Sequence, residues 1–315
     1  MDQKKVWNQA VVELRRESPE SKMDTLCELF GKSRQAYYQQ AKHNYNEVVR
    51  TEFILDFVVQ QRKLMPRIGG RKLHYIIQNQ LPEDLVPGRD KFFDLLREKG
   101  LLVKKKRYRA KTTWSNHWMR KYPNLIKEFI PDRPHQLWVS DITYLETKQG
   151  FVYLFLITDA YSRKIIGWSL SDTLEAKNAV AALRMALRQL PNNVTDIYHH
   201  SDRGSQYCSS EYVKLLNKRN LNISMTESGD PLENAIAERV NGILKTEWIY
   251  DIKLKDTNEA IKQVNRIIKI YNSIRPHDSI ERLTPNIAHE GIGELNRLWK
   301  NYYRKQELEQ IYKGL

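Results

Sequence analysis

Cysteine is scarce in this sequence: its 315 residues include two cysteines, Cys27 and Cys208, which lie far apart. That number and spacing support neither a disulfide framework nor a thiolate zinc site. No run approaches the ~18 apolar residues of a membrane span, and the N-terminus lacks an apolar signal segment. These absences predict a soluble, cytoplasmic protein with no membrane partner. The hydrophobic content of 41% is sufficient for the cores of two or three domains.

Positive charge is abundant and unevenly distributed along the chain. Residues 1–130 carry 27 Lys/Arg against 15 Asp/Glu, a net charge of +12, whereas residues 131–315 carry 25 against 23, a net charge of +2. A basic first part joined to a nearly neutral second part indicates a polyanion-binding module attached to a domain with a different role. The alternative is that the charge only promotes solubility, although balanced charge would do so equally well.

The first 48 residues have the sequence pattern of a helix-turn-helix. Apolar side chains recur at helical spacing in residues 3–17 and 23–30, with Cys27 expected as a small buried hydrophobe. Gly31 is expected to end the second helix, and Ser33 to cap a polar helix that begins with Arg34. This pattern predicts DNA binding through Arg34, and the alternative is a structural helical hairpin.

A second helical module is expected over residues 49–111. It contains three helical patterns, the first at 52–64, and ends in the basic run "KKKRYRAK". We expect this run to lie on phosphate, the alternatives being a solvated face or a disordered arm. Residues 112–134 are interpreted as a linker with some helix. The cations of the run that we expect on DNA are Lys104, Lys105, Lys106, Arg107 and Arg109.

From residue 135 the pattern changes to strands alternating with helices. Three strand-like runs come first and predict an antiparallel meander. A helix, a strand, a second helix, a short strand and a third helix follow, up to residue 250. This order predicts a mixed α/β domain.

Three acids stand out in this α/β region. Asp141 lies in the first strand, Asp202 at the end of the fourth and Glu238 on the last helix, with 60 and 35 residues between them. If the first and fourth strands are neighbours, the two aspartates lie side by side. Carboxylate oxygens suit Mg²⁺, and two such ions about 3.5–4 Å apart can act on a phosphodiester. Singly, each acid has a structural alternative, such as shaping a turn for Asp202 or facing solvent for Glu238.

Several motifs resemble the OrfB transposase of the bacterial insertion-sequence-three family, a DDE transposase family similar to retroviral integrases. They are "SDITYL", "ITDAYSRKIIGW", "HSDRGSQY", "NAIAERVNGILKTE" and "YNSIRPHDSIERLTP". The resemblance implies a ribonuclease H-like core, a mixed five-stranded sheet with helices, preceded by helix-turn-helix-type modules. It implies a catalytic, metal-binding triad of Asp141, Asp202 and Glu238, with two Mg²⁺ ions per site and Mn²⁺ as a substitute.

The same resemblance implies partners and an activity. The substrates would be double-stranded DNA, both terminal inverted repeats and target DNA, handled by a homodimer or higher oligomer in the bacterial nucleoid. An upstream-frame fusion partner is a further expectation. The protein would cleave element ends and transfer strands. The alternatives are a DNA-binding regulator with an inactive core, or a ribonuclease H-like nuclease on RNA–DNA hybrids.

Further DNA contacts are expected around the triad. Lys245, seven residues after Glu238, matches a basic position of the family and shares the helix face of that acid. Asn234 lies one turn before Glu238, where it would orient that acid or contact DNA, and Arg203 follows Asp202. Glu233, before Asn234, departs from the family aspartate and puts a second glutamate near the site.

The remaining assignments concern structure. Ile68-Gly69-Gly70 replaces the family's aromatic-Gly pair, which leaves the second module less defined. Asp159 is interpreted as structural, and His277 as packing or contacting phosphate. The expected boundaries are 1–48, 49–111 and 112–134 for the front modules and linker, 135–252 for the core, and 253–315 for a helical tail.

Overall fold

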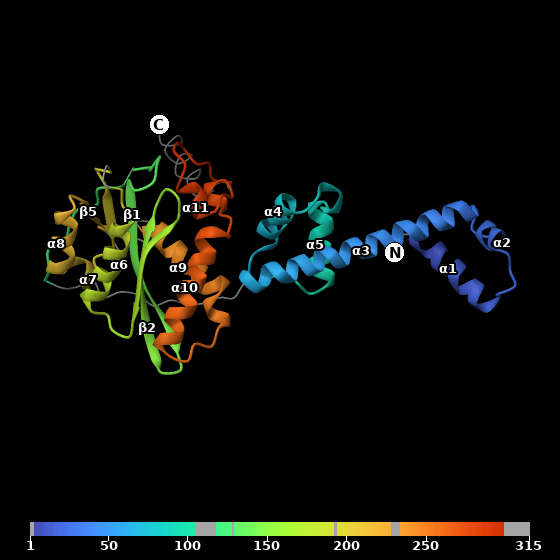
Figure 1. The fold of residues 1–315 in the computed structure, drawn as a ribbon, viewed down its shortest axis with the longest axis horizontal. Coiled ribbons are helices and arrows are strands. Elements are labelled where there is room, and N and C mark those ends of the chain that lie inside the picture. Colours follow the sequence, from blue (N-terminus) through green and yellow to red (C-terminus); the bar gives the residue numbers. More distant parts are fainter. Residues whose placement is uncertain (1–2, 105–117, 128, 192–193, 228–233, 299–315) are drawn as a thin grey trace, which may run out of the picture. The chain divides into compact units, whose positions relative to one another are not determined.

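The computed structural model describes residues 3–104, 118–127, 129–191, 194–227 and 234–298 (Figure 1). It contains two compact units, one formed by residues 1–63 with 73–95 and the other by residues 64–72 with 96–315. Across these described ranges, no helix is both long enough and apolar enough to cross a membrane.

The first unit begins with two short helices, a turn and the start of a long third helix. Helices α1 (Gln3–Glu17) and α2 (Met23–Glu28) precede a turn at Gly31, whose φ of +65° is a left-handed conformation that glycine adopts without strain. The Ser33 hydroxyl then accepts a hydrogen bond of 3.1 Å from the Ala36 backbone N–H at the start of α3, as the sequence predicted. The buried core of this part consists of Val11, Met23, Leu26 and Cys27.

Helix α3 (Arg34–Leu64) differs from the prediction, because it is one continuous helix where the sequence indicated separate helices over 33–42 and 52–64. The intervening residues 43–51 contain neither glycine nor proline, so nothing in them stops a helix that has started. The guanidinium of Arg50, in this intervening stretch, donates to the carbonyl oxygens of Leu85 and Val86 at 3.1 and 2.8 Å.

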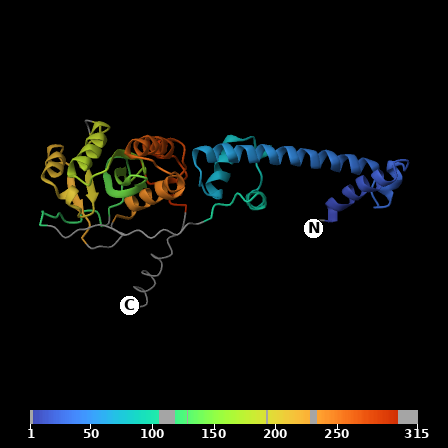
Figure 2. The ribbon, with the colours of Figure 1, turned by 90° about the horizontal axis from the view of Figure 1, so that it is seen from below.

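Two helices complete the first unit and lie beside α3 in Figures 1 and 2. They are α4 (Gly70–Gln80) and α5 (Arg89–Glu98), joined by the 3₁₀ turn η1 (Glu83–Leu85). Their apolar faces, with Ile77 and Phe92 fully buried, give this part of the chain its own core.

The second unit is built on a five-stranded sheet with strand order β3-β2-β1-β4-β5. Strands β1 (Leu137–Thr147), β2 (Gly150–Asp159) and β3 (Ile165–Ser171) form the predicted antiparallel meander. Strand β4 (Tyr198–Ser201) pairs with β1 in parallel, and β5 (Asn222–Met225) pairs with β4 in parallel. The first and fourth strands are therefore neighbours, which is the condition under which the two aspartates lie side by side.

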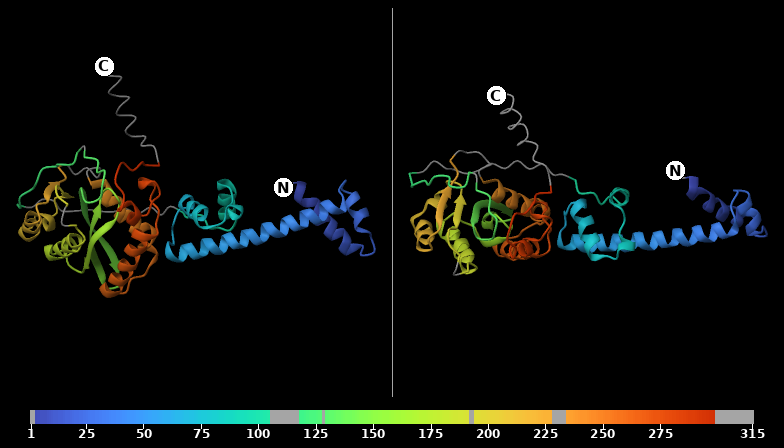
Figure 3. Two further views of the ribbon diagram at one scale, coloured as in Figure 1. Left: turned by 45° about the horizontal axis from the view of Figure 1, so that its top comes forward. Right: turned by 90° about the horizontal axis from the view of Figure 1, so that it is seen from above.

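Helices cover both faces of this sheet, as Figures 2 and 3 show. Alternate residues of β1 point to opposite faces, so Trp138 joins the core with α6 and α8 while Leu137 and Val139 pack with α9. At Gly167 on β3, a Cβ atom would lie 2.3 Å from the Ala182 carbonyl oxygen, so glycine permits the close approach of α6. The helices of this unit are α6 (Ala176–Arg188), α7 (Ser205–Cys208), α8 (Ser210–Lys218), α9 (Ala235–Glu247), η3 (Ile249–Asp251), α10 (Thr257–Ser273), η4 (Asp278–Ile280) and α11 (Pro285–Ala288).

Residues 64–72 belong to the second unit and are held there by polar contacts. The Trp248 indole N–H donates to the Leu64 carbonyl oxygen at 2.8 Å. Ion pairs join Arg67 to Asp251 at 3.5 Å and Lys72 to Asp278 at 3.2 Å. These contacts connect the turn after α3 to the segments that follow α9 and α10.

Residues 118–134 also pack on the second unit, although the sequence indicated a linker with some helix. Their described residues contain no helix, and the Met225 N–H donates to the Pro123 carbonyl oxygen at 3.2 Å beside β5. The Leu125 N–H donates to the Ser224 hydroxyl at 2.9 Å. The domain boundaries inferred from the sequence stay a prediction, and residues 299–315 of the expected helical tail lie outside the described residues.

Candidate active site

The pairing register of β1 and β4 aligns the first two predicted acids. Val139 pairs with His200 in this parallel ladder. Advancing both strands by two residues brings Asp141 level with Asp202, just after β4 ends. β1 continues past Asp141 to Thr147, so the alignment follows from the register of the parallel pair and not from a shared strand end.

Asp141 is held by two hydrogen bonds. Its Oδ1 accepts from the Ile142 backbone N–H at 2.9 Å, and its Oδ2 accepts from the Asn241 side-chain amide at 2.7 Å. Because Asn241 lies on α9, the second bond connects the catalytic candidate on β1 to the helix that carries Glu238.

The three predicted acids interact electrostatically. The pKa of Asp141 is raised to about 7, mainly by burial and next by the Asp202 carboxylate, with a smaller contribution from Glu238. The hydrogen bonds from Asn241 and Ile142 act in the opposite direction. A carboxylate whose pKa is raised by a neighbouring carboxylate lies in a site that favours a cation.

Helix α9 positions several side chains against β1. Asn234, just before its first turn, is buried, and its side-chain amide donates to the Ser140 carbonyl oxygen at 2.9 Å. The Lys245 ammonium lies 4.5 Å from the centre of the Tyr144 ring. Burial lowers the pKa of Lys245, and the Asp141 carboxylate offsets part of that shift. Asn241 and Lys245 are three and seven residues after Glu238, so they share a helix face with it.

Asp202 shapes the turn after β4 as well as facing Asp141. Its Oδ1 accepts from the Gly204 backbone N–H at 3.0 Å, which is the structural role considered as an alternative. The two roles are compatible, since the carboxylate has a second oxygen. Nearby, the buried Tyr207 hydroxyl has no hydrogen-bond partner among the described residues, and burial, followed by the charge of Asp202, raises its pKa well above the ordinary value.

Glu238 lies in the first turn of α9 and is exposed to solvent. Within the part of the chain that the structure describes, no three acidic, His or Cys side chains are close enough together to hold one metal ion. Asp141 and Asp202 are nevertheless matched to a hard cation, because they offer carboxylate oxygens and repel each other. The donor set therefore fits Mg²⁺ or Mn²⁺, with Glu238 as the third available carboxylate.

The other predicted DNA contacts lie in different environments. Arg203 is half-buried beside Asp202, whereas Arg34 is exposed at the start of α3, 5.7 Å from the centre of the Tyr38 ring. Lys104 is exposed, and its carbonyl oxygen accepts from Arg67 at 2.5 Å. The remaining cations of the basic run, Lys105, Lys106, Arg107 and Arg109, lie outside the described residues.

The sequence did not single out the residues that support the first acid. No motif in the sequence marked Asn241 as a partner of Asp141; the available indication was its position one helical turn after Glu238. Ser140 shares a buried network with His199 and Tyr212, in which the His199 Nε2 lies 2.8 Å from both hydroxyl oxygens. This network holds β1 in place at Ser140, the residue directly before Asp141.

Asp159 has the structural role predicted for it. It is completely buried and accepts hydrogen bonds from the His135 backbone N–H at 2.7 Å and from the backbone and hydroxyl of Ser162 at 2.8 Å each. These bonds close the turn after β2. With its oxygens engaged in this way, Asp159 serves the fold on the far side of β1 from Asp202.

Comparison with known proteins agrees with this architecture. Two models of the integrase core domain match residues 131–231 and 219–285. The chain is 34% identical over 266 residues to the 31 kDa protein of insertion element IS600 from Shigella sonnei, covering 82% of this chain and 96% of that protein. It is 40% identical over 158 residues to the transposase InsF of insertion sequence IS3A from Escherichia coli, covering 49% of this chain and 54% of that transposase.

A solved structure shows a more distant likeness. The catalytic core domain of HTLV-2 integrase in complex with magnesium has a TM-score of 0.40 and 18% identity, covering 50% of this chain and 97% of that domain. The sheet order, the aligned aspartates and the matched domain models together define an integrase-type, ribonuclease H-like core. The chain belongs to the insertion-sequence-three family of DDE transposases.

Proposed function

We propose that this chain cleaves the ends of its own insertion element and joins the freed ends to other DNA. In the first step a water oxygen attacks phosphorus, the bond from phosphorus to the 3′ oxygen breaks, and that oxygen leaves as a 3′-hydroxyl. In the second step the 3′-hydroxyl attacks another phosphodiester, and one new P–O bond replaces the one that breaks. The observation that supports this most strongly is the alignment of Asp141 with Asp202, with Asn241 bound to the former.

The proposed metal ligands are Asp141, Asp202 and Glu238. Two Mg²⁺ ions, when bound, would activate the attacking oxygen and stabilise the leaving one. The amide of Asn241 would orient the Asp141 carboxylate and keep it ionised, because a hydrogen bond donated to a carboxylate favours its charged form. Lys245, which lies close to Asp141, would contact the phosphate being attacked.

The first unit and the basic run would hold the DNA. We assign recognition of the terminal inverted repeats to the α2-turn-α3 element with Arg34, and backbone contacts to Lys104, Lys105, Lys106, Arg107 and Arg109. Arg203 and Asn234 are proposed to act close to the acids. Since two element ends must be held together, a homodimer or larger assembly on DNA is expected, and a fusion partner from an upstream frame would add to it.

The direct test uses labelled duplexes that carry the element ends, with Mg²⁺ or with EDTA. The proposal predicts nicked and joined products with Mg²⁺, none with EDTA, and none from Asp202→Asn even though that variant still binds DNA. A wild-type protein that binds DNA and performs no chemistry with any divalent metal would instead indicate a regulator. Cleavage of RNA–DNA hybrid without cleavage of element ends would indicate a ribonuclease.

A further inference from the structure

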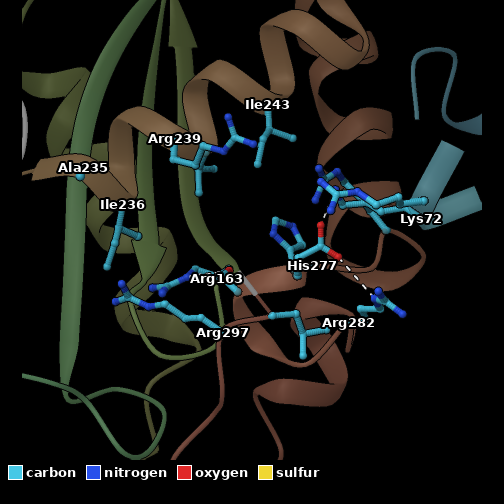
Figure 4. Close-up of a pocket in the computed structure, with 15 residues that line it drawn as sticks. Lys72, Arg163, Ala235, Ile236, Arg239, Ile243, His277, Arg282 and Arg297 are labelled. Carbon is cyan, nitrogen blue, oxygen red and sulfur yellow. Dashed lines mark hydrogen bonds and ion pairs between the residues drawn. The ribbon is translucent and has the colours of Figure 1, made fainter. Parts of the chain in front are cut away.

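A second polar site lies on the other side of α9 from the acids. It is a cavity of about 640 Å³, lined by side chains from α9, from the turn after β2, from the first turn of α4 and from the segments after α10 (Figure 4). All of these residues belong to the second unit. Ile236, Arg239 and Ile243 of α9 line it, whereas Glu238, Asn241 and Lys245 lie on the helix face toward β1.

The lining is strongly cationic. It includes seven Lys or Arg residues and one acid, Asp278, an excess of six positive charges. Asp278 pairs with Lys72 at 3.2 Å and with Arg282 at 3.5 Å, the contacts dashed in Figure 4. The cations that line the cavity together with Arg275 are Arg71, Lys72, Arg163, Arg239, Arg282 and Arg297.

Two of the guanidinium groups are close enough to repel each other. Arg163 and Arg297 lie side by side below Ile236 in Figure 4, and burial followed by the charge of Arg297 lowers the pKa of Arg163 to about 10. Arg163 is fixed in place, since it donates to the Ala160 carbonyl oxygen and to the Ser279 hydroxyl. An anion between these side chains would relieve the repulsion.

The buried part of the cavity is preorganised. Arg275 is 1% exposed and donates twice to the Glu247 carboxylate, at 2.6 and 2.7 Å, so Glu247 compensates its charge from behind. His277 beside it is 4% exposed, packs edge-on against Tyr271, and has an Nε2 without a hydrogen-bond partner among the described residues. Buried polar atoms are normally hydrogen-bonded, so this Nε2 of His277 indicates room for a ligand that accepts a hydrogen bond from it.

We propose that this cavity binds phosphate groups of a DNA strand, so that α9 separates a catalytic site from a backbone-holding site. This inference rests on the proposed function, because DNA is the polyanion that the chain would handle. Guanidinium groups on several elements can bind phosphate oxygens bidentately, and the His277 Nε2–H would donate to one of them. Arg239 and Arg297 are exposed at the rim, where a strand can enter from solvent.

The spacing of the two sites agrees with one continuous strand. A helix with its side chains is about 10–12 Å across, and successive phosphates of an extended strand are several ångströms apart. A strand that passes the acids could therefore place a phosphate two or three nucleotides away in the cavity. Lys245 on one face of α9 and Arg239 on the other would contact the same backbone.

The test compares Arg239→Gln/Arg297→Gln with Arg266→Gln/Lys269→Gln in the 315-residue chain. Arg266 and Lys269 are exposed residues of α10 outside the cavity, and this variant removes the same two charges, so it is the matched control. The probe is a labelled 30-base-pair duplex of arbitrary sequence, titrated at several salt concentrations. The double variant should bind about tenfold more weakly, with a salt slope smaller by about 2, because each phosphate contact contributes ~0.9 to that slope. The control should match the wild type.

A buried variant makes the test more specific. His277→Phe preserves the ring that packs on Tyr271 and removes the Nε2–H, so it should weaken duplex binding by about threefold while thermal unfolding reports whether the fold is intact. Inorganic tripolyphosphate should raise the Tm of the wild type more than that of the double variant.

Two results would overturn the inference. Unchanged affinity and salt slope in the double variant would show that duplex DNA does not use the cavity. If tripolyphosphate still stabilised the wild type selectively in that case, the site would belong to a free polyphosphate instead of DNA. Neither result depends on catalysis, whereas the proposed function fails if the wild type never cleaves or joins element ends, so the two failures are distinguishable.

Discussion

At the scale of single residues, the proposed active site depends on how Asp141 is held. Its carboxylate receives the Asn241 amide at 2.7 Å from α9, while Asp202 lies level with it on the neighbouring strand. The hydrogen bond favours the ionised form and the neighbouring acid opposes it. The Asp141 carboxylate is therefore held by one contact that favours its charge and by one that opposes it.

The first prediction concerns Asn241. Replacing it with alanine removes a donor to ionised Asp141, so the pKa of Asp141 should rise further and metal affinity should fall about 10- to 100-fold. Cleavage rates measured against pH and against Mg²⁺ should show an acidic limb moved to higher pH and a higher Mg²⁺ requirement. Asn265→Ala, at an exposed position of α10, is the control. An unchanged Mg²⁺ requirement in Asn241→Ala would contradict this role.

The second prediction concerns the free energy of unfolding of Asp141→Asn. The pKa of Asp141 is about 7 in the fold against an ordinary 3.8, so the folded state holds an unfavourable charge above pH 7, and this cost disappears as the pH falls toward 3.8. Without metal, the variant should be more stable than the wild type by about 4 kcal/mol at pH 8 and equal to it near pH 3.5.

Metal addition supplies the control for this second prediction. Mg²⁺ at pH 8 should raise the Tm of the wild type and leave Asp141→Asn nearly unchanged, because a ligand stabilises only the state that binds it. Equal free energies of unfolding of the two proteins at pH 8 without metal would contradict a raised pKa of Asp141 in the folded state.

At the scale of secondary-structure elements, the sequence was most informative where periodicity and turn residues agreed. The three-strand meander was predictable from apolar runs bounded by turn residues such as Gly150, whereas the parallel pairing of the fourth strand with the first required the structure. The continuity of α3 was not, because residues 43–51 have no clear apolar period and the absence of a helix breaker decides their conformation. The cationic cavity was also not predictable, since Arg163, Arg239 and Arg297 are brought together only by the tertiary fold.

The third prediction concerns the contact between α6 and β3. Gly167→Ala would place a Cβ 2.3 Å from the Ala182 carbonyl oxygen, so the layers must separate, at a cost of about 2–3 kcal/mol in the free energy of unfolding. Gly242→Ala in α9 is the matched control, because no atom within 4 Å opposes its Cβ and a helical alanine should add about 0.5–1 kcal/mol. Chemical denaturation of both variants measures the difference, and a loss at Gly242 equal to that at Gly167 would disprove the steric account.

At the scale of the whole molecule, the charge is divided between a basic first part and a nearly neutral second part. Residues 1–130 carry a net charge of +12 and residues 131–315 a net charge of +2. The integrase-type core contributes chemistry, and we expect the basic part to provide most of the affinity for DNA. The acids could be proposed from the sequence because their order and spacing match a family, whereas their hydrogen-bond partners required the fold.

The fourth prediction follows from this division. Lys104→Gln/Lys105→Gln should lower the slope of log affinity against log salt for duplex DNA by about 2. Lys262→Gln/Lys269→Gln, two exposed lysines of α10, removes the same charge outside the basic run and should change the slope little. Equal changes in both double variants would indicate that net charge alone, and not the basic run, governs DNA binding.

The central claim is that Asp141, Asp202 and Glu238 form one catalytic site, and the most direct measurement is strand joining by Glu238→Gln beside Glu233→Gln. The two glutamates are five residues apart, and the substitution is the same, so DNA binding should be similar in both. With Mg²⁺ and labelled element ends, the account predicts joined products from the wild type and Glu233→Gln, and a loss of at least a hundredfold in Glu238→Gln. Joining that persists in Glu238→Gln and disappears in Glu233→Gln would contradict it.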